Sequence, residues 1–270
     1  FVEYALNIAM KQNWKVVIRT GQRFLDDLDS IEQNKEVKLL SSNSLTEIMD
    51  SGGLPASGDV GISFSAPWII PKNIIEKFNG KIFNLHNQPL PRLRGCGGSS
   101  WNILMHEKTL GCTIHQLTPE IDGGDIYASK IFSVPEDFVY PKDYDELIKN
   151  KAKELIEEWL PNLLETGDPG TPKDNKDSES DYWPRLNTEI HAWINWSWSI
   201  GEIITFCHAF SYPHKGAKTT INEGIINIQE VSEHETNKNF HPYQSGIVYR
   251  IDNENLYVAH KDGALKIKKY

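Results

Sequence analysis

Apolar residues in the first 165 positions recur with helical and with extended spacing in turn. A helical set opens the chain, comprising Val2, Ala5, Leu6, Ala9 and Met10. Beyond it, apolar runs predict strands at 14–18, 60–64, 81–85, 111–117 and 125–132, and helices at 71–78, 99–105 and 143–164. Alternation of this kind is typical of an α/β domain with a mostly parallel sheet.

Two polar stretches interrupt this pattern. Residues 19–50 carry more acidic than basic side chains and predict a solvated helix and loop. Residues 165–181 are rich in turn formers and charge and have almost nothing to bury, so we expect a linker over 165–185 that closes a first domain at 1–164. Because α/β domains usually begin with a strand, we also expect a further strand before Phe1.

The last part of the chain, 186–270, has a different pattern. A helix is predicted at 199–210, and short alternating runs separated by turns follow from 218 onward. This pattern predicts a small antiparallel sheet or barrel. Tryptophans stand close together at 193, 196 and 198, the last two at alternate positions, which favours packing at a domain junction over a binding surface.

Charge and cysteine content narrow the classes of partner. Lys and Arg total 28 against 37 Asp and Glu, a net charge of −9, so the chain lacks the positive field that drives nucleic-acid binding. No apolar run approaches the ~20 residues of a spanning helix, and we expect no membrane partner. The 3 cysteines show no C-x-x-C spacing, which argues against disulfides or a metal site and favours a cytoplasmic location.

Three side chains between 81 and 130 suit one kind of chemistry. Asn84 offers an amide donor, His86 changes charge near neutral pH, and a nearby Asp122 is expected to raise the pKa of His86 and hold it protonated. Together they would stabilise an oxyanion, at roughly 3–4 kcal/mol per donor, while Asp122 takes a proton from an attacking amine, directly or through a water. Spacing alone fits structural roles for these residues equally well.

The predicted sheet indicates where Asn84, His86 and Asp122 would lie. If the strands at 60–64 and 81–85 pair in parallel, Asn84 and His86 lie near the carboxyl end of a strand, where open α/β sheets bind ligands. The glycines that follow Asp122 allow a sharp turn that would present its carboxylate to the same place.

These segments resemble the formyltransferases that use N10-formyltetrahydrofolate. The family motifs N-x-H-x-S-L-L-P, R-G, G-x-T-x-H and D-x-G correspond here to residues 84–91, 94–95, 111–115 and 122–124. The resemblance places the family's catalytic triad on Asn84, His86 and Asp122. Gln88 and Pro89 stand where the family has Ser and Leu, so the shape of this loop is in question.

The resemblance continues to the C-terminus, with I-N-W at 194–196 and H-A-F-S-Y-P-H-K-G-A at 208–217. It implies a Rossmann-like catalytic domain, an OB-like domain at 186–270, and N10-formyltetrahydrofolate as formyl donor. The loop 65–71 is similar to the family's pterin loop, although a buried strand end would give the same pattern. The donor contacts implied are Pro67, Trp68, Ile69, Ile70, Leu117, Glu120 and Ile121.

Members of this family formylate methionyl-tRNA, glycinamide ribonucleotide or the amine of a nucleotide-linked sugar. Residues 186–270 carry eight Lys or Arg against nine acids, which argues against tRNA, and the second domain argues against the ribonucleotide. We therefore expect a nucleotide-linked amino sugar of a surface-glycan pathway. Its candidate contacts are Arg94, Gly95, Gly97 and Trp101, where glycines admit close approach, a helix start suits a phosphate and an aromatic ring suits a sugar or base.

Other interpretations remain open at this point. Trp101 is equally suited to anchor its helix in a core. Methionyl-tRNA formyltransfer, hydrolysis of formyltetrahydrofolate by the same triad, and a non-catalytic glycan- or nucleotide-binding module are the alternatives to sugar formylation. Apolar residues near Tyr270 are consistent with a homodimer.

Overall fold

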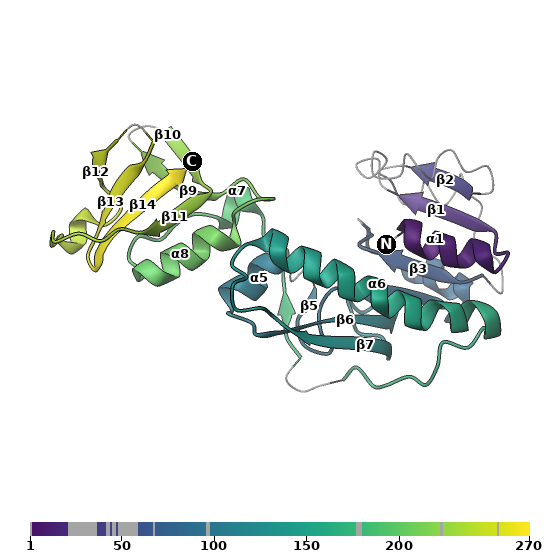
Figure 1. Ribbon diagram of the computed structural model, residues 1–270. Helices are drawn as coiled ribbons and strands as arrows, with labels where there is room; N and C mark the ends of the chain where they lie inside the picture. Colours follow the sequence, from purple (N-terminus) through teal and green to yellow (C-terminus); the bar gives the residue numbers. More distant parts are fainter. Residues whose placement is uncertain are drawn as a thin grey trace. The chain divides into compact units, whose positions relative to one another are not determined.

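The computed structural model describes residues 2–20, 37–41, 44, 47, 59–66, 68–95, 98–176, 180–221, 224–252 and 254–270. The chain forms two compact units, drawn in Figure 1. The first unit comprises Phe1–Gly95, Leu110–Phe132 and Ile148–Trp183, and the second comprises Cys96–Thr109, Ser133–Leu147 and Pro184–Tyr270. The domain boundaries predicted at 164 and 186 stay a prediction.

Among the described residues, strands of the first unit form one mixed sheet and two separate parallel pairs. Its larger sheet has the order β3-β4-β6-β7, with β3 at Gly61–Phe64, β4 at Ile82–His86, β6 at Thr109–Gln116 and β7 at Ile126–Ser133. β3 and β4 run parallel, as predicted, with Gly61 opposite Ile82. β4 and β6 run antiparallel, with Asn84 opposite His115.

The expectation of a mostly parallel sheet is therefore wrong for these four strands. β6 and β7 also run in opposite directions, because Gln116 bonds to Asp125 at one end and Val134 to Lys108 at the other. Residues 117–125 join the two strands without a helix, and a parallel pair requires a longer crossover. The β3–β4 connection does contain helix, α4 at Lys72–Ile75 continued by η3 at Glu76–Phe78, and these strands are parallel.

The parallel pair β1 (Val16–Thr20) and β2 (Val37–Ser41) corrects a second expectation. Residues 19–50 were expected to form a solvated helix and loop, but 37–41 is a strand whose backbone bonds to β1. Five residues with mixed polarity are too short to show a period, so tertiary pairing decides their structure. The predicted helix itself lies largely outside the described residues.

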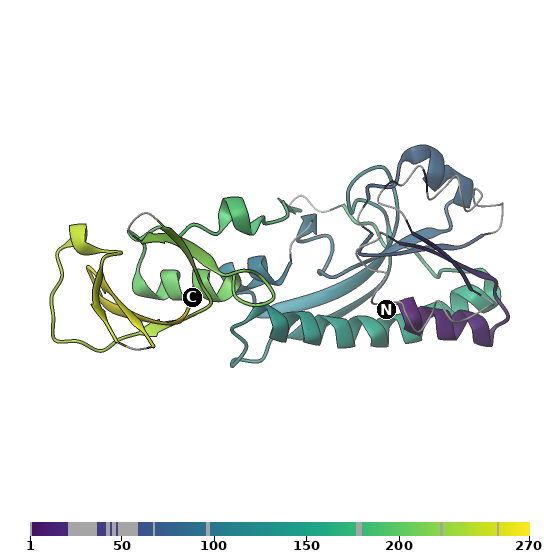
Figure 2. The same cartoon turned by 90° about the horizontal axis from the view of Figure 1, so that it is seen from above.

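Two helices cover one face of the larger sheet, as Figure 2 shows. α1 (Val2–Lys11) and α6 (Pro141–Thr166) confirm the predicted helical stretches. Their apolar sides meet strand residues in one core cluster, whose buried members are Ala5, Phe83, Leu85, Cys112, Ile114, Ala152, Leu155, Ile156, Trp159, Leu160, Leu163 and Leu164. Since helices fill this face, we expect residues that contact a ligand to lie on the other face of the sheet, at strand ends or in loops.

A cavity of about 310 Å³ lies among α1, β1 and β3 in the first unit. Trp68 and Ile70 line it, together with Leu160 and Leu164 of α6. None of Asn84, His86 and Asp122 lines this cavity. The further strand expected before Phe1 stays a prediction.

The second unit combines short helices with an antiparallel sheet, as predicted from the alternating runs. The helices are α5 (Ser99–Leu104), α7 (Thr188–His191), α8 (Ile200–Ala209) and the 3-10 helix η4 (Pro242–Gln244). β9 (Ala217–Ile221) and β10 (Gly224–Ile228) form a hairpin. β11 (Glu230–Glu233), β12 (Val248–Ile251), β13 (Leu256–His260) and β14 (Gly263–Lys269) assemble in the order β11-β14-β13-β12.

Local sequence explains how α8 starts and where it packs. Ser199 and Glu202 form a capping box, so two backbone donors of the first turn are satisfied by side chains. The helix then buries Ile203, Phe206 and Cys207 and lies against β11. Trp198 packs its ring edge on Phe206 with centroids 5.1 Å apart, in line with the packing role predicted for that tryptophan.

None of the helices in the described parts of the chain is long and apolar enough to cross a membrane.

Candidate active site

Strand register brings three polar side chains to one face of the sheet. Asn84 and His86 are two residues apart on β4, so they point to the same face. His115 on β6 stands directly opposite Asn84, and Thr113 stands opposite His86. As predicted, His86 is the last residue of its strand; Asn84 lies two residues before the end.

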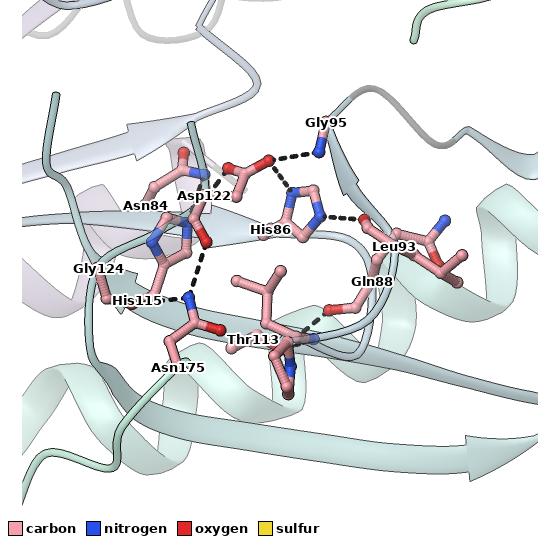
Figure 3. A network of polar contacts seen from close by, with 12 residues as sticks. Asn84, His86, Gln88, Leu93, Gly95, Thr113, His115, Asp122, Gly124 and Asn175 are labelled. Atoms are coloured by element: carbon pink, nitrogen blue, oxygen red, sulfur yellow. Dashed lines mark hydrogen bonds and ion pairs between the residues drawn. The ribbon is translucent and has the colours of Figure 1, made fainter. Parts of the chain in front are cut away.

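Asp122 enters this face from the loop after β6 (Figure 3). Its Oδ2 lies 3.6 Å from His86 Nδ1 and accepts a hydrogen bond of 2.8 Å from the backbone N–H of Gly95. Its Oδ1 lies 3.5 Å from His115 Nε2. The three residues selected from the sequence therefore come together, and His115 joins them.

Hydrogen bonds to backbone carbonyls fix the tautomers of both histidines. Nε2 of His86 lies 3.0 Å from the carbonyl of Leu93, and Nδ1 of His115 lies 2.9 Å from the carbonyl of Gln116. A carbonyl only accepts, so each of these nitrogens carries a proton. In the neutral rings the lone pairs are then on His86 Nδ1, which faces Asp122, and on His115 Nε2.

The same reasoning orients the amide of Asn84. Asn84 Nδ2 lies 3.1 Å from the unprotonated Nε2 of His115, so it is the nitrogen of the amide that faces the histidine and donates. One N–H of Asn84 is used in this way. The amide plane is thereby fixed, and its second N–H has a defined direction.

Burial decides the charge of His86. Burial lowers its pKa, and the nearby Asp122 carboxylate and the Leu93 carbonyl compensate only in part. Asp122 does raise the pKa of His86, as expected, but the expectation that it keeps His86 protonated is wrong, because the sequence did not reveal how deeply the ring is buried. His86 is neutral at neutral pH and is poised to accept a proton.

Asp122 is held ionised in spite of its burial, because neighbouring groups favour the charged form. Burial alone would raise its pKa, but its interactions with His115 and His86 and the hydrogen bond from the Gly95 N–H outweigh burial and lower the pKa. A carboxylate with a lowered pKa is a weak base and a good counter-ion. Its place beside His86 suits it to stabilise an imidazolium.

Glycine is required where the backbone of two loops comes close to this site. At Gly95, which has φ +91, a Cβ would lie 2.5 Å from the ring of Tyr182. At Gly124 a Cβ would lie 1.9 Å from the carbonyl oxygen of Gln116. Asp122 itself has φ 48, in the left-handed region that is unusual for a residue with a side chain.

Comparison with known families decides the classification. The family model for formyl transferase matches residues 30–164, and the model for the formyl transferase C-terminal domain matches residues 188–270. The chain belongs to the formyl transferase family. The triad motif and the histidine of β6 both lie inside the first match.

Relatives of this formyl transferase family member include methionyl-tRNA formyltransferases and sugar N-formyltransferases. A methionyl-tRNA formyltransferase of Rickettsia bellii is 28% identical over 211 residues, which is 78% of this chain and 65% of that protein. The sugar 3N-formyl transferase WlaRD, crystallised with dTDP and 5-N-formyl-THF, superposes with a TM-score of 0.69 at 18% identity and covers 98% of this chain and 93% of that one. An N-formyltransferase from Helicobacter canadensis, in complex with folinic acid and dTDP-3-aminofucose, has a TM-score of 0.63 at 19% identity and covers 95% and 99%.

Residues predicted to hold the formyl donor lie in two loops of this family member. Trp68 and Ile70 pack around Ile74, while Ile69 is 78% exposed and Ile121, beside Asp122, is 46% exposed. Leu117 donates its N–H to the carbonyl of Ile82, and the exposed Glu120 forms an ion pair with Arg94. Pro67 lies outside the described residues. Their donor contacts stay predictions.

The residues predicted for the second substrate are divided between the two units. Arg94 and Gly95 lie in the first unit, where Gly95 contacts Asp122 and the Arg94 guanidinium bonds to Glu120 and to the carbonyl of Asn175. Trp101 lies in the second unit and donates its indole N–H to Pro184 at 2.8 Å, which fits the helix-anchor alternative. Gly97 lies outside the described residues.

Two residues that contact the triad or its loop were not among the predicted site residues. His115 is the last residue of the G-x-T-x-H motif at 111–115, so the sequence held a signal for it. Asn175 was not considered at all, because it lies in a stretch with the composition of a linker. The structure places its side chain against the loop that carries Asp122.

Proposed function

We propose that this protein transfers the formyl group of N10-formyltetrahydrofolate to the amino group of a nucleotide-linked amino sugar. The proposal rests on one observation above all. His86 is buried and neutral, has its only lone pair on Nδ1, and has the ionised Asp122 3.6 Å from that atom.

His86 acts as the general base. The bound donor supplies an electrophilic formyl carbon and, in tetrahydrofolate, a leaving group. His86 Nδ1 takes the proton that the amine loses as its nitrogen bonds to that carbon, and returns it to N10 as the carbon–N10 bond breaks. The Asp122 carboxylate stabilises the imidazolium between these two steps. A positioned base of this kind contributes about 10²–10⁴-fold to a rate.

Asn84 supplies the oxyanion contact. The formyl oxygen gains negative charge when the amine attacks, and the second N–H of Asn84, fixed in direction by His115, donates to it. Fixed donors aimed at a developing charge are worth about 10²–10³-fold each. His86 does not share this task, because its Nε2–H is already bonded to Leu93.

The loop that carries Asp122 and the loop that follows β3 suit a flat, partly apolar donor. Ile121 and Ile69 expose large apolar side chains, which a ring system would cover. Glu120 offers an exposed carboxylate beside Ile121 for polar groups at the ring edge. These features support the donor assignment.

An amino sugar is favoured as the acceptor by charge and by extent of similarity. The net charge of −9 and the acidic balance of 186–270 oppose a polyanion as large as tRNA. The sugar formyltransferases cover nearly the full length of this chain and of themselves. We infer that the sheet of the second unit is an OB-like domain.

The test is to incubate the protein with N10-formyltetrahydrofolate and UDP-, dTDP- or GDP-linked amino sugars. Formylated sugar, found by mass spectrometry in equal amount to the tetrahydrofolate released, supports the proposal. Tetrahydrofolate release that is the same without any amine would instead indicate a hydrolase.

Methionyl-tRNA is the second candidate, because the Rickettsia relative carries that activity in its name at 28% identity. The same assay with methionyl-tRNA as acceptor separates the two. We expect little formylation of the tRNA, and a higher kcat/KM for tRNA than for every sugar would reverse the assignment.

A further inference from the structure

Residues 173–176 and 180–183 contact the strands and loops around the candidate site at several points. Lys173 and Ile126 exchange two backbone hydrogen bonds of 2.8 Å. Further along, β8 (Tyr182–Trp183) pairs in parallel with β5 (Arg94–Gly95). The part of this segment that the structure describes is therefore attached to the catalytic unit along much of its length, in contrast to the free linker expected from its composition.

Within this segment, Asn175 contacts the backbone of the turn that carries the Asp122 carboxylate. Its side chain is fully buried, and its Nδ2 donates to the carbonyl of Asp122 at 2.7 Å and to the carbonyl of Gly124 at 2.9 Å. Both N–H groups are thus spent on the turn that carries Asp122, as Figure 3 shows.

The side-chain oxygen of Asn175 indicates that the residue is present for its two N–H donors. Asn175 Oδ1 is buried and has no hydrogen-bond partner among the described residues. A side chain kept only for packing would avoid a buried unpaired oxygen, since that is unfavourable. The two N–H bonds outweigh this cost, which points to the turn as the reason for the residue.

The turn needs such support because of its backbone conformation. Asp122 has φ 48, and residues with a side chain populate this region reluctantly. Without a clamp the turn can relax toward ordinary conformations, and the carboxylate would then leave the Gly95 N–H and His86 Nδ1. Arg94 reinforces the clamp, because its guanidinium donates to the carbonyl of Asn175.

We propose that Asn175 is a positioning residue of the active site, which holds the left-handed turn of Asp122 so that the carboxylate stays beside His86. This inference goes beyond the proposed function in naming a residue, and it rests on that function only for its kinetic readout. Asn175 does not touch the reacting atoms; it acts through Asp122.

The first test needs no catalysis. The titratable groups that face His86 are Asp122 and His115. NMR titration of His86, assigned with a His86→Gln variant, is compared between the unmodified protein, Asn175→Ala and Asp122→Asn. We expect His86 to titrate at lower pH in both variants, with the smaller shift in Asn175→Ala, because the carboxylate that favours its charged form has moved or is gone. An unchanged titration in Asn175→Ala would overturn the proposal.

Kinetics supply the second test and a matched control. Asn175→Ala is expected to lower kcat on the order of ten- to a hundred-fold with little change in the KM of either substrate, as a small displacement of a catalytic group does. In the double variant Asn175→Ala/Asp122→Asn the losses should not multiply, because both act on the same carboxylate. Asn162→Ala, which removes a single exposed hydrogen bond from the side-chain amide to the carbonyl of Asp168, should keep full activity.

The outcomes separate the two proposals. An inactive unmodified protein whose His86 titration still responds to Asn175→Ala would retain the positioning role and refute the proposed function. Losses that multiply in the double variant would refute the positioning role alone. If Asn175→Ala proves too unstable, Asn175→Ser, which keeps one short donor, takes its place with an intermediate shift expected.

Discussion

Replacing Asp122 by Asn tests how the site handles its proton. The change keeps the size of the side chain and removes one negative charge 3.6 Å from His86 Nδ1. Coulomb's law gives roughly 4 to 5 kcal/mol for two unit charges at this distance with an effective dielectric constant of about 20. The charge of the carboxylate is spread over two oxygens and its side chain is 13% exposed, so about 3 to 4 kcal/mol remains.

That energy acts on the imidazolium that forms while the amine proton is on His86. At about 1.4 kcal/mol per factor of ten, kcat should fall roughly 10²- to 10³-fold. Asp122 lies between His86 and Gly95 and the reaction passes through His86, so the KM of the donor should change little. The neighbouring exposed Asp125→Asn variant makes the same charge change and should retain full activity.

The pH dependence of kcat/KM tests the same assignment independently, through the direction in which its acid limb shifts. His86 must be neutral to act, so kcat/KM falls on the acid side as pH drops through its lowered pKa. Removing the carboxylate removes an interaction that raises this pKa, and the acid limb should move to still lower pH in Asp122→Asn. A kcat within about threefold of the original, or an acid limb moved to higher pH, would refute the assignment of His86 as base.

Three further experiments test the burial and packing described above. The lowered pKa of His86 means that the unfolded chain binds more protons, so the unfolding free energy should fall from about pH 7 to pH 5, and Tm in His86→Gln should fall less over that range. Gly124→Ala should lower the unfolding free energy in urea by about 2 kcal/mol or more and should also lower kcat. The control Gly201→Ala has open space around it in helix α8 and should be neutral or slightly stabilising. Equal behaviour of the two variants would refute the packing argument. Burial raises the pKa of Cys112 and of Cys207 to about 12, so mass spectrometry should find neither thiol alkylated at pH 8 in the folded protein and both alkylated in urea.

Long periodic elements were predictable from the sequence because their pattern extends over several turns. The helix at 141–166 and the parallel pairing of the strands at 61–64 and 82–86 are examples. The strand at 37–41 was not predictable, since its apolar residues are too few to show a period. The mixed direction of the sheet depends on which strand lies between which, and local composition carries no information about that.

Among the residues of the candidate site, too, some features were predictable from local sequence and others were not. Asn84, His86 and Asp122 were predictable because their chemistry and spacing form a recognisable motif. The charge of His86 was not, since it depends on how far burial outweighs a neighbouring carboxylate. Asn175 was missed because a donor that reaches back from a polar, turn-rich segment leaves no local signal.

The measurement that tests the central proposal most directly is a stoichiometric acceptor assay. Purified protein is mixed with N10-formyltetrahydrofolate and each nucleotide-linked amino sugar in turn, and the tetrahydrofolate and formylated sugar are both quantified. We predict that one amino sugar gives equal amounts of the two products and that the Asp122→Asn variant forms them at least ~100-fold more slowly. Tetrahydrofolate release that no amine accelerates, or that Asp122→Asn leaves unchanged, would contradict the proposal.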